Sequence, residues 1–231
     1  MTAKNAACPI VTIDGPSGSG KGTISRAVAS RVGWHLLDSG ALYRLVALAG
    51  MAAGAAEDDV ARHAGLAERM DVRFDVASGG AERIWLDGKD VTTGVRSEEA
   101  GQGASRVAAW PEVRTALLER QRAFARPPGL VADGRDMGTV VFPAADLKIF
   151  LTATPEERAL RRHKQLKDKG SDVSLPALSR EIAERDLRDR TRKVSPLKAA
   201  PDACLIDSTG LTVEQVAGRV LDLMAARRLW P

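Results

Sequence analysis

A glycine-rich loop that ends in lysine is the part of this chain best suited to phosphate chemistry. It follows an apolar run and leads into a helical pattern, and its residues are Gly15, Pro16, Ser17, Gly18, Ser19, Gly20, Lys21, Gly22 and Thr23. Glycines permit positive φ, so successive backbone N–H groups can point into one concavity. The next helix adds its positive N-terminal end, and Lys21 adds a charge that can follow the β- and γ-phosphates. We therefore expect this loop to bind phosphate rather than to form a turn without a ligand.

The residue after the lysine departs from the common form of this loop. A serine or threonine hydroxyl usually stands there and ligates Mg²⁺, whereas this chain has Gly22 and only then Thr23. We expect Mg²⁺ as the cofactor, held mainly by phosphates and water. Thr23 and Asp133 are candidates for contact through water, and no direct protein ligand is assigned. The variant favours a nucleoside monophosphate kinase over a GTPase.

Two further segments place polar residues after apolar, strand-like runs. Asp38 ends one run, Ser39 can cap the next helix, and Tyr43 and Arg44 fall in its first turns. Taken alone, Ser39 also fits a plain helix cap and Arg44 a surface charge. These residues are candidates for the binding of a second substrate.

The other segment follows an apolar run that ends in Asp133, where phosphate-loop enzymes place a carboxylate associated with Mg²⁺. Arg135 and Asp136 come next, in a loop flanked by glycines. Two adjacent opposite charges at the end of a strand suit a polar substrate, although they could also pair with each other in solvent.

A charge-dense helix near the C-terminal end carries the fourth group. Its apolar stripe is Leu175, Leu178 and Ile182, and steps of seven extend that stripe to Arg185, Asp189 and Arg192. Inward charges need ligands or partners, so we expect these three to face a cleft. Asp186, Arg190 and Lys193 are expected on a solvated face.

The preceding helix carries three arginines before a polar loop at 167–174. Arg158, Arg161 and Arg162 suit a small mobile lid that brings cations onto the transferring phosphate. A solvated helix explains them equally well. We assign Arg161 to ATP binding and Arg162 to catalysis as hypotheses.

These residues need a parallel sheet to bring them together. Short apolar runs predict strands at 10–14, 34–38, 130–133, 147–152 and 203–207. Helical patterns alternate with them at 23–32, 41–53, 111–125, 155–169, 175–193 and 212–227. The expected fold is an α/β phosphate-loop kinase, a five-stranded parallel sheet with helices on both faces.

One region interrupts the alternation of strands and helices. Polar and apolar residues alternate at 71–76 and 83–86, with a glycine turn at 78–80 and a further short strand near Val91. We expect a single domain over 1–231, with an inserted lobe at about 60–105 that holds a small antiparallel sheet, and a short lid at about 158–175.

Composition and charge limit the classes of function. The chain has 231 residues, is 44% hydrophobic and 28% charged, and has no apolar run of the roughly 20 residues that a membrane span needs. Residues 1–7 lack the apolar core of a signal peptide. Two distant cysteines fit reduced thiols of a cytoplasmic protein, and three scattered histidines argue against a zinc site.

The formal net charge of +4 falls within 156–193, which holds twelve Lys and Arg against eight Asp and Glu. Interleaved acids and only nine aromatic residues in the chain argue against a nucleic-acid surface. They favour a basic cleft for small polyphosphates.

Taken together, the four motifs are similar to those of bacterial cytidylate kinases along nearly the whole chain. The stretches that carry the resemblance are 13–23, 36–44, 132–143, 184–186 and 189–190. The resemblance implies transfer of a phosphoryl group from ATP to CMP or dCMP, with Mg²⁺, by a sheet flanked by a lid and a lobe that binds the monophosphate.

The resemblance also implies roles for individual residues. Ser105, Arg114 and Asp136 would read the cytosine edge, and Arg185 and Asp189 would contact the ribose. The CMP phosphate would be held by Arg44, Arg135 and Arg192, of which Arg135 and Arg192 join Lys21 as catalytic candidates.

We expect ATP and CMP or dCMP as the partners, with no nucleic acid and no membrane, and a monomeric enzyme of pyrimidine nucleotide metabolism. A UMP/CMP kinase or another small-metabolite kinase of the same fold is the alternative enzyme. A nucleotide-binding switch or an RNA-binding module is the alternative from another class.

Overall fold

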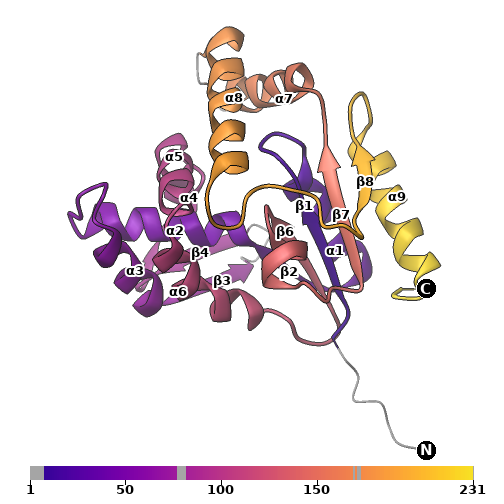
Figure 1. Cartoon of the computed structure of the whole chain (residues 1–231), viewed down its shortest axis with the longest axis horizontal. Helices are drawn as coiled ribbons and strands as arrows, with labels where there is room; N and C mark the ends of the chain where they lie inside the picture. Colours follow the sequence, from indigo (N-terminus) through magenta and orange to yellow (C-terminus); the bar gives the residue numbers. More distant parts are fainter. Residues whose placement is uncertain (1–7, 77–81, 169, 171–172, 231) are drawn as a thin grey trace, which may run out of the picture. The chain divides into compact units, whose positions relative to one another are not determined.

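A five-stranded parallel sheet forms the centre of the larger part of the chain (Figure 1). This computed structural model describes residues 8–76, 82–168, 170 and 173–230. The strand order is β2-β6-β1-β7-β8. The strands are β1 (Ile10–Asp14), β2 (His35–Asp38), β6 (Leu130–Gly134), β7 (Leu147–Thr152) and β8 (Cys204–Asp207). The predicted parallel sheet is confirmed, with every strand boundary within one residue of the expected one.

The register aligns polar residues at the carboxyl edge of this sheet. Asp38 of β2 lies level with Asp133 of β6, and Asp14 of β1 lies level with Gly134. All five residues of β6 are buried, which explains why its sequence is nearly continuous in apolar residues. Ligands of open α/β sheets bind outside this edge, so the site is sought there.

Helices α1 (Lys21–Val32) and α9 (Val213–Ala226) pack against each other and cover the main apolar core. Strand residues such as Val11, Ile149 and Ile206 meet Val28 and Val220 of these helices in that core. Helix α9 begins with a capping box, in which Thr212 and Gln215 satisfy each other's backbone N–H groups. This packing fixes the phosphate loop between two rigid elements, β1 and α1.

Helices α7 (Pro155–Lys167) and α8 (Leu175–Thr191) lie side by side, as the orange ribbons of Figure 1 show. Thr154 caps α7 by accepting from the Glu157 N–H, with Pro155 in the first helical position. The sequence predicted this start. Part of the segment between the two helices, at 169 and 171–172, lies outside the described residues, as do residues 1–7.

The chain divides into two compact units. We call the first the sheet unit; it contains the residues through Asp38 and those from Arg122 onward. The second, the helical unit, spans Ser39–Gln121. Each unit is described separately below.

The helical unit combines helices with a small antiparallel sheet of order β3-β4-β5. Its strands are β3 (Val72–Val76), β4 (Glu82–Leu86) and β5 (Lys89–Asp90), and its helices are α2 (Ser39–Ala52), α3 (Val60–Arg69), α4 (Thr92–Val95), α5 (Glu98–Val107) and α6 (Pro111–Arg122). The predicted hairpin is confirmed, and its third strand ends just before Val91. The predicted turn at 78–80 lies outside the described residues.

Several helical elements were missed by sequence reasoning: α3, α4, α5 and a π-helical turn, η1 (Met137–Val141). Helix α5 contains two glycines and few large apolar residues, so its pattern is weak. The structure gives Gly103 a packing reason: a Cβ there would lie 2.8 Å from the Cβ of Ala47 on α2. The glycine that weakens the helical signal is thus the residue that lets two helices approach closely.

Among the residues that the structure describes, no helix is both long enough and apolar enough to cross a membrane.

Candidate active site

The phosphate loop is shaped so that its amide groups are available. Gly18 and Gly20 have φ of 77° and 89°, left-handed conformations that glycine adopts without strain. Gly20 precedes α1 and supplies no side-chain cap to the first turn of that helix. Lys21 lies across the loop, where its Nζ donates to the carbonyl oxygen of Pro16 at 3.2 Å. The geometry is that of an anion site built from backbone N–H groups and one ammonium.

Helix α7 holds the carbonyl side of the same loop. A guanidinium N–H of Arg158 donates to the Ser17 carbonyl at 3.0 Å, and one of Arg161 donates to the Ser19 carbonyl at 3.2 Å. Ser208, which follows β8, also donates to the Ser19 carbonyl, at 3.1 Å. Because these carbonyls are engaged from outside the loop, its N–H groups are the part left for a ligand.

Arg158 and Arg161 are thus both hydrogen-bonded to the phosphate loop. Arg161 also bonds to Glu157 and to Ser208, at 2.8 and 2.6 Å. Arg162 is half-buried on the same helix, and Thr23 is exposed in the first turn of α1. The assignments of Arg161 to ATP binding and of Arg162 to catalysis stay predictions.

The carboxylate of Asp133 fills the space beside Gly22. A Cβ at Gly22 would lie 3.1 Å from Asp133 Oδ2, which accounts for glycine where a hydroxyl residue is usual. Asp133 Oδ1 is buried and makes no hydrogen bond within the described structure. Burial raises the pKa of Asp133 to about 7, against the lowering effect of Lys21. Burial, helped by the charge of Arg135, lowers the pKa of Lys21 to about 7.

A cluster of three arginines surrounds one carboxylate near the loop. The Arg135 Nε donates to Asp189 Oδ2 at 2.9 Å, and an Nη of Arg192 lies 4.0 Å from Asp189 Oδ1. Burial alone would raise the pKa of Asp189, but Arg135, Arg185 and Arg192 together hold it below its usual value. Guanidinium groups gathered in this way can bind a phosphate group through charge-assisted hydrogen bonds.

One residue of α8 was assigned to the wrong face. Asp186 was expected to be solvated, but it is 7% exposed. Two guanidinium nitrogens of Arg158 bond to its two carboxylate oxygens, at 3.0 and 2.6 Å. The buried face of α8 advances by helical steps through Leu178, Ile182, Asp186 and Asp189. The prediction was wrong because steps of seven drift from the true helical period, which adds Asp186 to the stripe.

For the three residues of α8 and its C-terminal end that were expected to face inward, the observed burial agrees with the prediction. Asp189 is buried, the side chain of Arg192 is 6% exposed, and Arg185 is half-buried. Arg190 and Lys193 are exposed, as expected. The sheet unit thus brings Lys21, Asp133, Arg135, Arg185, Asp189 and Arg192 together.

The helical unit groups a second set of predicted residues. Arg114 on α6 places its guanidinium carbon 5.5 Å from the centre of the Tyr43 ring, and it donates to the Ala108 carbonyl at 3.0 Å. Arg44 donates to the Val95 carbonyl at 2.9 Å. Ser105 on α5 has a buried hydroxyl that makes no hydrogen bond in the described part of the chain. A buried hydroxyl without a partner fits a group that meets a ligand.

Two residues at the boundary of the units need comment. Ser39 was expected to cap the next helix, but α2 begins at Ser39 itself, so the serine lies in the first turn. Asp38 is the exposed last residue of β2.

Asp136 is buried, at 2% exposure, and directly precedes η1.

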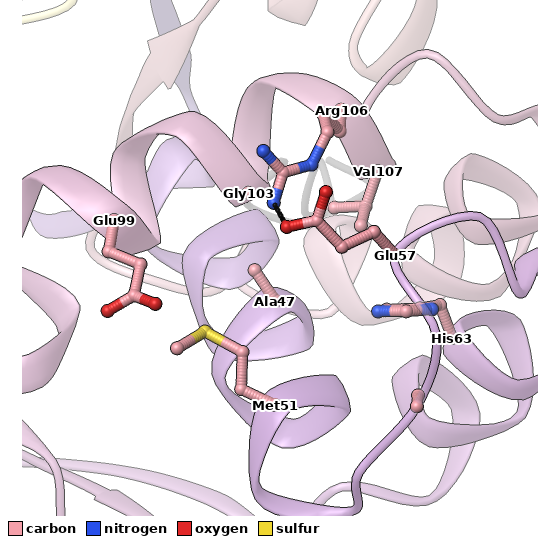
Figure 2. Close-up of a pocket in the computed structure, with 9 residues that line it drawn as sticks. Ala47, Met51, Glu57, His63, Glu99, Gly103, Arg106 and Val107 are labelled. Atoms are coloured by element: carbon pink, nitrogen blue, oxygen red, sulfur yellow. Dashed lines mark hydrogen bonds and ion pairs between the residues drawn. The ribbon is translucent and has the colours of Figure 1, made fainter.

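A pocket in the helical unit is separate from these residues (Figure 2). It has a volume of about 50 Å³, and a 2.8 Å ion pair between Arg106 and Glu57 lies at its wall. His63, also at the wall, is hydrogen-bonded to the Asp59 carbonyl and packs edge-on against Trp110. A nucleotide needs several hundred cubic ångströms, so this pocket is not the nucleotide site.

Sequence reasoning missed two residues that shape the site, Asp14 and Ser208. Asp14 accepts hydrogen bonds from two backbone N–H groups after Asp136. A charged residue at the end of an otherwise buried strand was the available signal for it. Ser208 shows no comparable signal, since its role depends on β8 lying beside β7.

Comparison with known proteins agrees with this geometry. A family model described as cytidylate kinase matches residues 11–226. A cytidylate kinase of Aeromonas salmonicida (strain A449) is 56% identical over 213 residues, which cover 92% of each chain. One of Azotobacter vinelandii (strain DJ / ATCC BAA-1303) is 56% identical over 221 residues, 95% of this chain and 96% of the relative. One of Pseudomonas savastanoi pv. phaseolicola (strain 1448A / Race 6) is 58% identical over 220 residues, with the same coverage. With a family match that runs from β1 to α9 and relatives of this likeness, the chain belongs to the cytidylate kinase family.

Proposed function

We propose that this protein transfers the γ-phosphoryl group of ATP to CMP or dCMP, giving ADP and CDP or dCDP. The observation that carries the proposal is the cluster of cations beside the phosphate loop. Lys21, Arg135, Arg185 and Arg192 gather beside the phosphate loop, around the carboxylates of Asp133 and Asp189. Such a group of cations suits the phosphate groups of two phosphorylated substrates.

Catalysis then consists of alignment and charge neutralisation. The acceptor is already a phosphate anion, so no general base is required. The phosphate loop and Lys21 hold the donor phosphates, while Arg135 and Arg192 of the sheet unit hold the CMP phosphate. In-line positioning and cations aimed at the transferring group supply the rate enhancement that such reactions need.

Within the sheet unit, recognition of the base is assigned to Asp136 and recognition of the ribose to Arg185 and Asp189. The helical unit offers Ser105 and Arg114 as its own candidates for contact with the base. Cytosine has an amine where uracil has a carbonyl. The Asp136 carboxylate accepts from that amine and would oppose the uracil oxygen. Because Asp136 is buried, a base that leaves it mispaired is strongly disfavoured.

The residues present fit a magnesium ion beside the donor phosphates. Asp133 Oδ1 is a buried oxygen without a hydrogen-bond partner in the described structure, and the Thr23 hydroxyl lies in the exposed first turn of α1. These two would hold the ion through water. Mg²⁺ supplies charge neutralisation for the triphosphate when bound.

We also propose a monomeric, cytoplasmic enzyme of pyrimidine metabolism, with a short lid at about 158–175 and the region at about 60–105 acting as the lobe for the monophosphate. The free thiols of Cys8 and Cys204 support a reducing compartment.

An assay of ADP release with ATP and each of four monophosphates tests the function. We expect CMP and dCMP to be comparable, UMP far slower, and AMP and GMP negligible. A preference for UMP would identify the alternative UMP/CMP type of enzyme, and a preference for AMP would overturn the assignment.

A further inference from the structure

Asp14 is a buried carboxylate that the proposed chemistry does not use. It is the last residue of β1, and it is 4% exposed. Its Oδ1 accepts from the Met137 N–H and its Oδ2 from the Gly138 N–H, both at 2.8 Å. A buried charge is costly unless it is hydrogen-bonded in this way. Burial raises the pKa of Asp14 to about 6, but the two backbone bonds and Arg135 oppose the rise, so the group is ionised at neutral pH.

The backbone that Asp14 holds is the continuation of the loop that carries Arg135 and Asp136. The carbonyl of Asp136 accepts from the N–H groups of Val140 and Val141, at 2.9 and 3.2 Å, and so begins η1. Because the next two N–H groups bond to Asp14, the backbone that directly follows the Asp136 carbonyl is held in place. Arg135 and Asp136 are the two residues that come just before this held segment.

The loop also lies tightly against β1. A Cβ at Gly138 would lie 2.8 Å from Thr12 Oγ1 and 3.2 Å from the side chain of Lys148. Any residue other than glycine would therefore force the loop or the Thr12 side chain to shift. Asp14 and Gly138 together keep the loop in one position.

Asp14 also occupies a special position in the chain, between two segments that are assigned to substrates. Its side chain holds loop 134–138, and its backbone leads directly into the phosphate loop at Gly15. One residue thus joins the segment assigned to the donor with a segment assigned to the acceptor. A change in its hydrogen bonds would shift the second relative to the first.

We propose that Asp14 is a positioning residue for the acceptor nucleotide: through its carboxylate it holds Arg135 and Asp136 at a fixed offset from the phosphate loop. The proposal rests on the proposed function. Both carboxylate oxygens of Asp14 are engaged by the loop, so we assign its effect to the position of that loop and hence to the binding and discrimination of the monophosphate.

The test is the isosteric variant Asp14→Asn, assayed near pH 8, where the carboxylate is ionised. The amide oxygen can accept from one N–H, but its NH₂ group faces the other. Losing one charged hydrogen bond predicts a rise in KM for CMP of roughly 10- to 100-fold and a smaller CMP-to-UMP ratio of kcat/KM, with KM for ATP within about threefold. The control is Asp146→Asn. Asp146 accepts from the Ile10 N–H at 2.8 Å, at the other end of β1, and this variant should leave both KM values unchanged.

If Asp14 had a purely structural role, Asp14→Asn would lower the thermal midpoint of unfolding but leave KM for CMP and the CMP-to-UMP ratio of kcat/KM at wild-type values. That result would overturn the proposal. If that variant does not fold, Gly138→Ala disturbs the same contact from the loop side. This variant too should raise KM for CMP much more than KM for ATP. Equal changes in the two KM values would overturn the proposal. A wild-type chain that does not phosphorylate CMP removes the proposed function and this inference with it. A wild-type chain that does, with both variants unchanged, removes the inference alone.

Discussion

The two units use different parts of the polypeptide for recognition. In the sheet unit, the phosphate loop presents backbone N–H groups, and α7 and Ser208 hold its carbonyls. In the helical unit, the candidate groups are side chains from separate helices, among them Tyr43, Ser105 and Arg114. A phosphate looks the same on every nucleotide, so backbone groups suffice to hold it. A base must be distinguished from other bases, which requires side chains.

This contrast predicts different consequences of mutation in the two units. Changes of Lys21, or of the residues that hold the carbonyls of the phosphate loop, should affect turnover and stability. Changes of the candidate side chains in the helical unit, and of Asp136 in the sheet unit, should affect which monophosphate is used. The predictions below are ordered from the largest expected effect.

Lys21→Ala should have the largest effect. It removes the ammonium that lies over the phosphate loop, and we expect kcat to fall by about 10³-fold or more. The fold should persist, because Lys21 contributes one hydrogen bond to Pro16. Steady-state kinetics and a thermal melt measure both. Arg31→Ala, at the other end of α1, is the matched control. A near-normal kcat would mean that the loop is not catalytic.

Asp186→Asn should reduce stability most. It leaves Arg158, which is 3% exposed, with a neutral partner, and breaking a buried ion pair costs about 3 kcal/mol. Since Arg158 also holds the Ser17 carbonyl, KM for ATP should rise as well. Urea denaturation compares it with Asp202→Asn, which weakens the pair of Lys148 with a carboxylate that is 64% exposed and should cost less than about 1 kcal/mol. Equal losses of unfolding free energy in the two variants would argue against a stabilising ion pair between Arg158 and Asp186.

Ser105→Ala separates binding from stability in the helical unit. The hydroxyl is buried without a hydrogen bond in the described structure, so its removal should leave the melting temperature equal or higher. If the hydroxyl meets cytosine, KM for CMP should rise by about 10-fold, with KM for ATP unchanged. Ser25→Ala, another buried hydroxyl without a partner among the described residues, should change neither. Loss of stability without a change in KM would assign Ser105 to packing.

Asp189→Asn tests the arginine cluster through pH. The pKa of Asp189 lies below its usual value, so the native state binds fewer protons than the unfolded state in acid. The stability that it contributes is therefore present above about pH 4 and lost as pH falls. At neutral pH the variant should be less stable by about 1 kcal/mol, and the difference should shrink in acid. A difference independent of pH would contradict this assignment.

The same contrast explains what sequence could reveal. The phosphate loop is a contiguous motif because its function depends on backbone conformation, and the five strands are short apolar runs because both faces are covered. Both features are local, and the structure confirms the strands to within one residue.

The features that were missed depend on long-range packing. Asp186 looks like one of many charges on α8 until Arg158, 28 residues away, is placed against it. In the sequence, Asp14 is simply the residue before the phosphate loop. The Met137 N–H that its carboxylate accepts from lies 123 residues later in the chain. Helix α5 carries a weak pattern because Gly103 serves the approach to α2. None of these partners is visible from local spacing.

The most direct test of cytosine recognition by a buried side chain is the CMP-to-UMP ratio of kcat/KM in the wild-type chain and in Asp136→Asn. We expect a wild-type ratio of about 100 or more, because uracil mispairs with the buried carboxylate. In the variant the ratio should fall toward one, since an amide can donate to the uracil oxygen. A wild-type ratio near one, or a ratio that the variant leaves unchanged, would contradict the assignment of Asp136 to the base.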